Sequence, residues 1–256
     1  MKRPTPKNAA QPNPSESPKS ARRKSTKAPG PGHPPAKAAR PRREQARATE
    51  TKRTILDAAL IEFAEKGFEA ASIRDIGQRI GFQHPLITYH YRTKELLWRA
   101  VAENAFIELR LLWDSIDPTT VPDTAIERVR AEYEAFLRFT IERPHFHHFM
   151  LRESQPGNPR LPWLVETILR PAIERLLPEI ADAQRAGDIP RVNPVLFHYL
   201  MIGLMSVLSS LGDEIEQISG ISTRDPAVID DYLALVDQLI FRRTPAPRKR
   251  TLKIRA

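Results

Sequence analysis

Apolar residues between positions 51 and 67 recur at the spacing of an α-helix. They form a stripe of residues four apart, flanked by two leucines: Ile55, Ala59 and Phe63, with Leu56 and Leu60 beside them. Such a stripe is one face of an amphipathic helix. Glycine readily takes the left-handed conformation found at helix ends, so Gly67 is a natural stop. We therefore predict a first helix that ends near Gly67.

Three further helices are predicted directly after it. Ser72 and Asp75 form an S-x-x-D capping box that opens a second helix, and Gly81 ends it. The segment HPLITYHY predicts a third helix, in which Pro85 is tolerated because it lies in the first turn. Thr93 is then the expected N-cap of a fourth helix.

Three short helices with a glycine-containing turn before the third are typical of a helix-turn-helix. In that geometry the third helix enters the DNA major groove. Leu86, Ile87 and Tyr91 are expected to pack inward. The residues expected to face DNA are Gln83, His84, Thr88, Tyr89 and His90. Spacing alone leaves one alternative open, which is an ordinary three-helix core with an amphipathic last helix.

The rest of the chain also follows helical patterns. Helices are predicted at about 94–113 and 123–142, with a short one opening at Pro144. A long segment at 161–187 contains Pro171 and Pro178, which are expected to kink or break it. Asn193-Pro194 and Asp225-Pro226 each combine an N-cap residue with a first-turn proline, so they predict the starts of two last helices.

The helix predicted at 194–211 is apolar on nearly every side and must therefore be covered on every side. A membrane span is not favoured, because His198 and several small polar residues interrupt the run and no basic flank adjoins it. A second subunit is the economical cover. The residues expected at this dimer interface are Leu196, Leu200, Gly203, Val207, Leu233, Val236 and Ile240.

Aromatic residues cluster around the segment RPHFHHFMLRE. Its three histidines do not share one helical face and the chain has no cysteine, so a metal site is not expected. An apolar ligand pocket is one interpretation, lined by Phe136, Phe139, Phe146, Phe149 and Trp163. The alternative is plain core, because aromatic stripes at helical spacing are commonly just that.

Charge is distributed unevenly along the 256 residues. Residues 1–48 carry thirteen Lys/Arg and two Glu, and residues 242–256 carry seven Lys/Arg. The body between them has a net charge of −9, although the whole chain has a net charge of +9. The Pro-rich segment 1–48 predicts a disordered basic tail, and 242–256 a second basic tail. No secretory signal is recognisable, and the absence of cysteine suits the cytoplasm.

The segment from Thr49 to Val101 closely resembles the N-terminal domain of TetR-family transcriptional regulators. The resemblance rests on three motifs: I-L-x-A-A-x-x-x-F-x-x-x-G-F, S-I-R-D-I, and Y-H-[FY]-x-[ST]-K-E-x-L. It implies an all-α protein with an N-terminal three-helix DNA-binding domain and a C-terminal helical domain that dimerises and binds a small molecule. The DNA-contacting positions it implies are Ser72, Gln83, His84, Pro85, Leu86, Thr88, Tyr89, His90 and Lys94.

Two positions depart from the family pattern. Position 83 is usually a small hydroxyl residue and is Gln here, while position 88 is commonly Tyr and is Thr here, next to Tyr89. These departures concern which side chain meets which phosphate. The end of the chain also has a weak similarity to the pyrimidine-utilisation regulator subgroup, which identifies no ligand.

We therefore expect a homodimeric, ligand-responsive, cytoplasmic repressor that binds a palindromic DNA operator. The expected organisation is a tail at 1–48, a DNA-binding domain at 49–100, an effector-binding and dimerisation domain at 101–241, and a tail at 242–256. The alternative is a basic-tailed DNA-coating or scaffold protein without operator specificity. Neither an enzyme nor a cofactor is expected, since no Gly-rich phosphate loop, GxSxG or HExxH is present.

Overall fold

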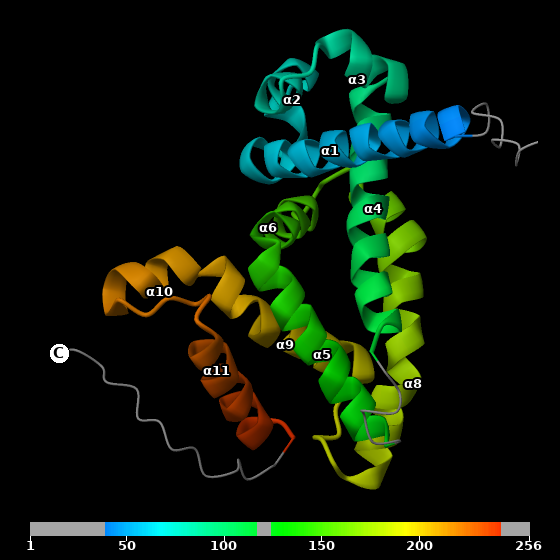
Figure 1. Ribbon diagram of the computed structural model, residues 1–256. Coiled ribbons are helices and arrows are strands. Elements are labelled where there is room, and N and C mark those ends of the chain that lie inside the picture. Colours follow the sequence, from blue (N-terminus) through cyan, green and yellow to red (C-terminus); the bar gives the residue numbers. More distant parts are fainter. Residues whose placement is uncertain (1–38, 117–123, 242–256) are drawn as a thin grey trace, which may run out of the picture. The chain divides into compact units, whose positions relative to one another are not determined.

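The computed structural model describes residues 39–116 and 124–241, with side chains from residue 45, and every regular element in these ranges is helical (Figure 1). The all-α prediction is confirmed. The N-terminal helices are α1 (Ala39–Ala70), α2 (Ile73–Ile80), α3 (His84–His90) and α4 (Lys94–Asp114). The remaining elements are α5 (Ala125–Glu142), α6 (Pro144–Glu153), α7 (Leu161–Leu164), the π-helix η1 (Val165–Leu169), α8 (Arg170–Ala186), α9 (Pro194–Ser210), α10 (Gly212–Ser219) and α11 (Pro226–Leu239).

The first helix is longer than the sequence pattern indicated. It begins at Ala39, ten residues before the expected boundary at Thr49. The added segment is rich in Ala, Arg, Glu and Gln, which have high helix propensity, and its proline lies near the start. The tail predictions for residues 1–38 and 242–256 lie outside the described residues. Gly67 interrupts the helix with φ 76°, as its role of stop requires.

Local capping chemistry sets the helix starts. The Ser72 hydroxyl accepts a hydrogen bond from the Arg74 N–H at 3.2 Å, and the Thr93 hydroxyl accepts from the Leu96 N–H at 3.1 Å. Asn193 and Asp225 accept in the same way from the second residue of α9 and of α11. The predicted capping box differs in one respect. The Asp75 carboxylate accepts a 2.8 Å hydrogen bond from the Lys66 ammonium.

The two prolines of the long 161–187 segment behave differently. Pro171 follows the π-helix, where the Arg170 N–H donates to the Val165 carbonyl five residues back. This wider turn changes the helical register just before the proline. Pro178 was expected to kink or break the helix, yet α8 continues through it. Pro178 is exposed, so the carbonyl that loses its N–H partner can bond to water.

Helix α10 was not predicted. It starts at Gly212, which lies so close to Thr223 that an added Cβ would meet the Thr223 hydroxyl at 2.8 Å. Gly220 ends the helix in the left-handed region at φ 70°. No single helix of the described ranges is both long and apolar enough to cross a membrane, and α9 and α10 reach that hydropathy only as a pair bent by 57°.

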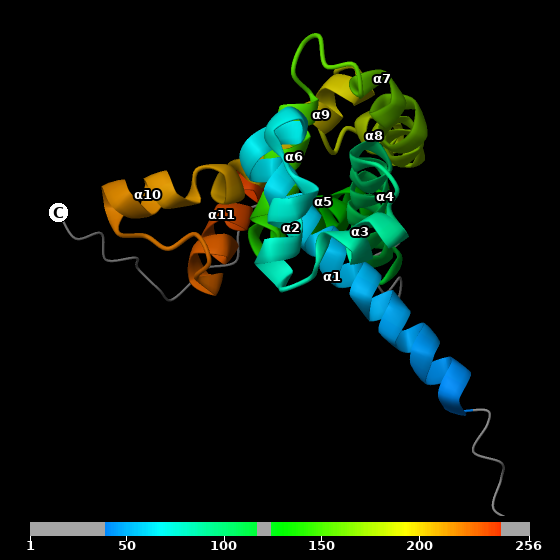
Figure 2. The ribbon, with the colours of Figure 1, turned by 90° about the horizontal axis from the view of Figure 1, so that it is seen from above.

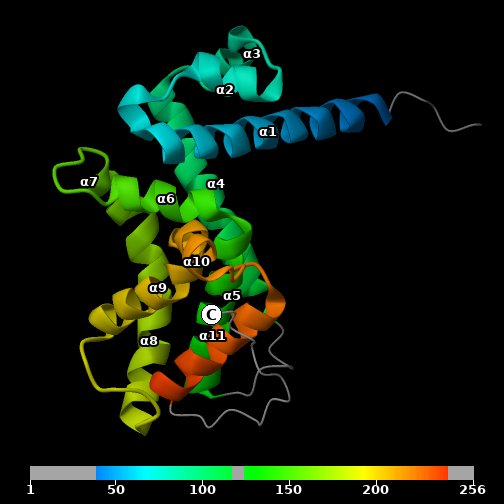
Figure 3. The ribbon, with the colours of Figure 1, turned by 90° about the vertical axis from the view of Figure 1, so that its left-hand side faces the viewer.

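Two clusters of buried residues hold residues 45–241 together. The larger cluster joins α4, α5, α6, α8, α9 and α11, with α5 packed against both α8 and α9 (Figure 3). The second cluster joins α1 to α4 with Phe149 of α6, Leu164 of α7 and Ile168 of η1. Helices α10 and α11 lie on the opposite side of α5 from α4 and α8 (Figures 1 and 2). The two sides of α5 therefore carry separate surfaces.

Candidate nucleic-acid interface and ligand cleft

The turn between α2 and α3 is set by a close backbone approach. The Phe82 N–H donates to the Gly77 carbonyl at 2.9 Å, and a Cβ on residue 77 would lie 2.6 Å from the Phe82 carbonyl oxygen. Gly81 takes φ 67° and closes α2. Ile87, fully buried, anchors α3 against this corner. The geometry is that of a helix-turn-helix, in which α3 is the second helix.

The N-terminal half of α3 faces solvent. Four of the predicted contact residues are exposed there: Gln83, His84, Pro85 and Leu86. Tyr89 is 81% exposed, which is unusual for an aromatic side chain without a partner surface. Leu86 was also expected to pack inward, and this was wrong, because it is 37% exposed. In this short helix only one side chain, that of Ile87, points fully into the core.

The hydroxyl residues of the predicted interface are already engaged with the backbone. Thr88 donates to the carbonyls of His84 and Pro85, both at 3.1 Å, and its oxygen can still accept. Ser72 caps α2, at a helix N-terminus where free N–H groups favour phosphate. His90 is half-buried, with its ring 5.2 Å from that of Tyr89.

Lys94 has a structural task. Its ammonium donates to the carbonyls of Glu69 at 3.0 Å and Ala71 at 3.1 Å, and it lies 4.7 Å from the centre of the Phe68 ring. An ammonium has three donors, so one remains for a phosphate. The residue therefore ties the end of α1 to the start of α4 whether or not it touches DNA.

Many charges of this domain neutralise one another. Glu62 is fully buried and lies 2.7 Å from Lys66 and 3.1 Å from Arg79. The hydrogen bond from Lys66 lowers the pKa of Asp75. Four cations form no ion pair with any described residue and were missed by the sequence analysis: Arg47, Lys52, Arg74 and Arg92. Arg47 and Lys52 lie on α1, Arg74 lies two residues after Ser72, and Arg92 precedes Thr93. These positions make them candidate phosphate contacts.

Helix α6 and the residues after it contact the end of α1. Arg152 of α6 donates to the carbonyls of Ala64 and Glu65, both at 2.7 Å. Arg160 lies 4.0 Å from the centre of the Phe68 ring and is held by the buried Glu153 at 3.1 Å. Because Gly67 interrupts the helix, these carbonyls lack helical partners that they would otherwise have. The DNA-binding helices and α6 are thus connected by hydrogen bonds as well as by packing.

An apolar face of α9 and α11 is exposed. On α9 it includes Leu196 at 66%, Tyr199 at 53% and Leu200 at 51% exposure, beside an exposed Gly203 and a half-buried Val207. On α11 the predicted interface residues are buried or half-buried within the chain. Val236 is 3% exposed within the chain's own core, and Leu233 and Ile240 pack against that core. The exposed residues of α11 are Leu235 and Leu239.

Four of the five aromatic residues predicted to line a ligand pocket are buried core residues, and the fifth, Trp163, is partly buried against the core. Phe136, Phe139, Phe146 and Phe149 are each at most 5% exposed. Trp163 packs against the Trp98 ring at 5.4 Å between centres. None of the five lines the cleft that the structure opens beside α4. The plain-core alternative was therefore the better interpretation of this stripe.

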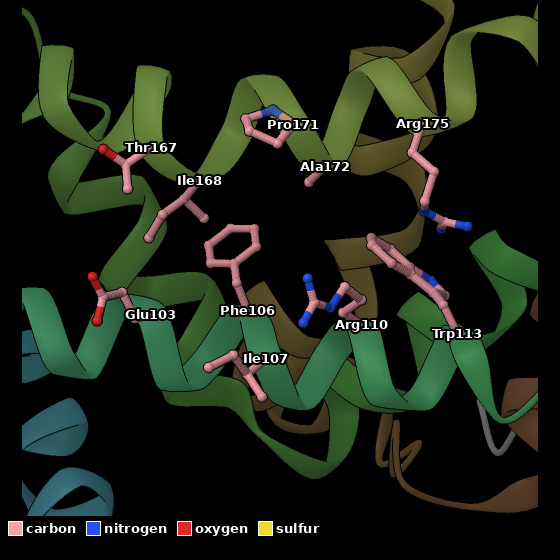
Figure 4. A pocket seen from close by; sticks show the side chains of 10 residues that line it. All are labelled: Glu103, Phe106, Ile107, Arg110, Trp113, Thr167, Ile168, Pro171, Ala172 and Arg175. Atoms are coloured by element: carbon pink, nitrogen blue, oxygen red, sulfur yellow. The ribbon is translucent and has the colours of Figure 1, made fainter.

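The cleft lies between α4 and the η1–α8 segment and has a volume of about 430 Å³ (Figure 4). Helix α4 and the η1–α8 segment each contribute one face, so that residues some sixty positions apart meet across it. The lining residues are Glu103, Phe106, Ile107, Arg110 and Trp113 from α4, and Thr167, Ile168, Pro171, Ala172 and Arg175 from the other side. Mostly apolar linings with a few polar groups are typical of small-molecule sites.

Comparisons with known proteins agree with the geometry of α1 to α4. Residues 55–101 match the family model described as "Bacterial regulatory proteins, tetR family". The chain is 39% identical over 74 residues to the HTH-type transcriptional repressor Rv3405c of Mycobacterium tuberculosis, which is 29% of this chain and 39% of that protein. It is 35% identical over 52 residues to IcaR, the negative transcriptional regulator of the biofilm operon icaADBC in Staphylococcus epidermidis, covering 20% of this chain and 28% of that one.

Solved structures share the fold over a longer range. The ketosteroid transcriptional regulator KstR2 of Mycobacterium tuberculosis superimposes with a TM-score of 0.58 at 18% identity, over 75% of this chain and 96% of that one. The transcriptional regulator SCO4942 of Streptomyces coelicolor gives a TM-score of 0.57 at 20% identity, over 75% and 99%. The chain spans about two fifths of the length of the curated relatives that it matches first. Residues 55–101 of this protein are therefore similar to the tetR family of bacterial regulatory proteins.

Proposed function

We propose that this protein is a sequence-specific, homodimeric transcriptional regulator whose DNA binding responds to a small molecule. The observation that carries the proposal is the exposed N-terminal half of α3, the reading helix, presented by a tightly built helix-turn-helix corner. An exposed Gln, His and Tyr on such a helix have the donors, acceptors and ring surface needed for base edges in the major groove. The relatives named as repressors support repression as the direction of control.

A second copy of the chain is the proposed cover for the apolar face of α9 and α11. One chain presents one reading helix, and a two-fold dimer presents two of them to one side of the duplex. Leu196, Tyr199 and Leu200 are each more than half exposed, which is costly for a face that remains in water. The operator is accordingly a palindrome with half-sites one helical turn, or a multiple, apart, and the dimer acts in the cytoplasm.

Two routes connect the cleft to the DNA-binding helices. Helix α4 starts at the Thr93 cap next to the reading helix and carries Arg110 and Trp113 into the cleft. Arg152 separately fastens α6 to the end of α1. A ligand that spreads or closes the cleft would tilt α4 and so change the position of α3 relative to its partner in the dimer. The ligand would regulate DNA binding because it binds one arrangement of α4 and α3 more tightly than the other.

The rival proposal is a DNA-coating protein without operator specificity. Residues 49–99 have eight Lys/Arg and seven Asp/Glu, so the folded DNA-binding domain is close to neutral. Non-specific binding depends on neutralising phosphates, and this domain alone is poorly equipped for it. Residues 1–38, with nine Lys/Arg and one Glu, would supply the attraction that is independent of DNA sequence.

A binding selection from random duplexes, run at two salt concentrations, separates the two proposals. The regulator enriches one short palindrome, and a protein lacking residues 1–38 enriches the same palindrome with weaker affinity and a shallower dependence on salt. A coating protein enriches no sequence at either salt concentration, and this result would reject the proposed function.

A further inference from the structure

The charges in the cleft beside α4 are arranged unequally along its length. Trp113 and Arg175 stand at one end with Arg110 next to Trp113, and Glu103 and Thr167 stand at the other end (Figure 4). Phe106, Ile168, Pro171 and Ala172 form the apolar stretch between these ends. The cleft therefore has a cationic end, an apolar middle and an acceptor-rich end, and a ligand would enter it in one orientation.

Arg175 is already neutralised by a fixed partner. Its guanidinium is 2.9 Å from the Glu132 carboxylate, whose side chain is 13% exposed, and lies 5.0 Å from the centre of the Trp113 ring. The Trp113 indole N–H donates to the Glu132 carbonyl at 3.2 Å. Trp113, Glu132 and Arg175 thus form a preassembled wall at the end of the cleft, with no net charge left over.

Arg110 differs from Arg175 because it forms no hydrogen bond or ion pair with any residue that the structure describes. Its guanidinium lies between Phe106 and Trp113, on the α4 side of the cleft (Figure 4). A guanidinium offers a planar fork of donors that matches the two oxygens of a carboxylate. An unpaired fork beside two aromatic rings is therefore well suited to bind an anion.

The size of the cleft and the charge at its far end further restrict the class of ligand that it can bind. A volume of about 430 Å³ lies at the small end of the roughly 300–1,000 Å³ usual for ligand pockets. The Glu103 carboxylate repels a second negative charge at the opposite end. The charge of the cleft therefore disfavours a dianion, and its size disfavours a bulky nucleotide.

We propose that the cleft binds a small organic monocarboxylic acid with a flat apolar body. The carboxylate pairs with Arg110, and the apolar body lies between Phe106 and the Ile168–Ala172 side of the cleft. This inference names the class of effector, so its regulatory meaning rests on the proposed function. The binding itself does not depend on that function.

The test compares acids with their uncharged amides on the purified full-length protein. Benzoate against benzamide and 2-naphthoate against 2-naphthamide are titrated by calorimetry and by tryptophan fluorescence, without DNA. A charge-assisted pair to Arg110 is expected to favour each acid over its amide by at least about tenfold. Arg110→Gln should remove the preference, and Arg110→Lys should keep part of it.

Arg185→Gln is the matched control, because Arg185 is an exposed arginine on α8 that is paired with Asp182 outside the cleft. Arg185→Gln should leave the preference for acid over amide unchanged. Thermal unfolding should show that the Arg110→Gln and Arg185→Gln proteins are both folded. Equal binding of acid and amide, no binding of either acid, or an acid preference that survives Arg110→Gln would each overturn the inference.

Operator binding is measured on the same samples, so the two proposals fail separately. Acid binding that depends on Arg110 but does not alter operator affinity would leave the site standing and remove its regulatory role. An operator-specific protein that binds neither acid would keep the proposed function and lose this inference.

Discussion

Arg152 Nε donates a 2.7 Å hydrogen bond to the carbonyl of Ala64, and Arg152 Nη2 makes an equal bond to the carbonyl of Glu65. One side chain of α6 thereby closes the end of α1, eighty-seven residues or more away in sequence. The bonds exist because Gly67 interrupts α1 and frees these carbonyls. They give the DNA-binding helices a direct hydrogen-bonded link to the domain that carries the cleft.

Arg152→Met should loosen this link without emptying the surrounding space. Leaving the part-buried Ala64 carbonyl without its donor costs about 1–3 kcal/mol, so the free energy of unfolding should fall by that order. Hydrogen exchange should quicken in residues 67–71 more than in α9. Arg138→Met, on the exposed side of α5, is the control and should change neither measurement. Equal exchange in both variants would show that Arg152 does not hold α1.

Gly77→Ala should damage the helix-turn-helix corner. The new methyl group would lie 2.6 Å from the Phe82 carbonyl oxygen, and backbone cannot move away as a flexible side chain can. Overpacking of this kind costs about 1–3 kcal/mol, so the melting temperature and operator affinity should both fall. Glu174→Ala, at an exposed position of α8, is the control and should change neither measurement. A Gly77→Ala protein as stable as the control would contradict the close approach.

His84→Ala and Lys94→Ala should have different effects on DNA binding. The His84 side chain is exposed and makes no hydrogen bond to the described backbone. Its removal should therefore weaken operator binding by roughly 1–3 kcal/mol and relax the base preference at one position per half-site. Random duplex should bind as before. Gln83→Ala is expected to behave in the same way.

Lys94→Ala removes two hydrogen bonds to the carbonyls of Glu69 and Ala71. It should therefore lower the melting temperature and weaken operator and random DNA alike. A fall of about one in the slope of log affinity against log salt would identify a phosphate contact in addition. If the Lys94→Ala protein is as stable as the unaltered protein and prefers a different base, Lys94 contacts bases and does not hold the end of α1.

Leu200→Glu should separate the proposed dimer. Leu200 is 51% exposed on α9, and a carboxylate there would be buried without a partner between two subunits. Sedimentation should show monomers, and operator affinity should fall because each chain then carries a single reading helix. Leu111→Glu is the control, since Leu111 is 59% exposed on α4, away from that face. A normal Leu200→Glu dimer would move the interface elsewhere.

His198 should make the folded state sensitive to acid. Burial lowers its pKa from 6.5 to about 4, and its Nδ1 is 3.0 Å from the hydroxyl of the buried Tyr133. The folded state disfavours the charged imidazolium, so the stability contributed by neutral His198 is fully present above pH 6.5. It is lost as the pH falls from 6.5 toward 4, and the loss should be on the order of 3 kcal/mol.

The non-titrating variant His198→Gln keeps an acceptor for Tyr133. Its free energy of unfolding should fall less steeply with decreasing pH in this window, by about one bound proton. His148→Gln, at an exposed position of α6, should retain the slope of the unaltered protein. Identical slopes for the His198→Gln variant and the unaltered protein would show that His198 does not bind the proton concerned.

Several features could be predicted from the sequence because they depend on neighbours along the chain. Thr93, Asn193 and Asp225 cap their helices through bonds to backbone N–H groups two or three residues ahead, and Gly81 ends α2 through its own left-handed conformation. These local interactions, with the period of the apolar stripe, were enough to predict the helical fold and the position of α3.

Tertiary packing alone decided which apolar face of a helix is inside. Helix α11 has apolar residues on more than one side, so its sequence does not distinguish the buried Val236 from the exposed Leu235 and Leu239. Four of the five aromatic residues assigned to a pocket are buried in the core for the same reason. Arg110 and Pro171 line one cleft because tertiary packing brings α4 and α8 together, and a local sequence pattern does not determine which elements some sixty residues apart become neighbours.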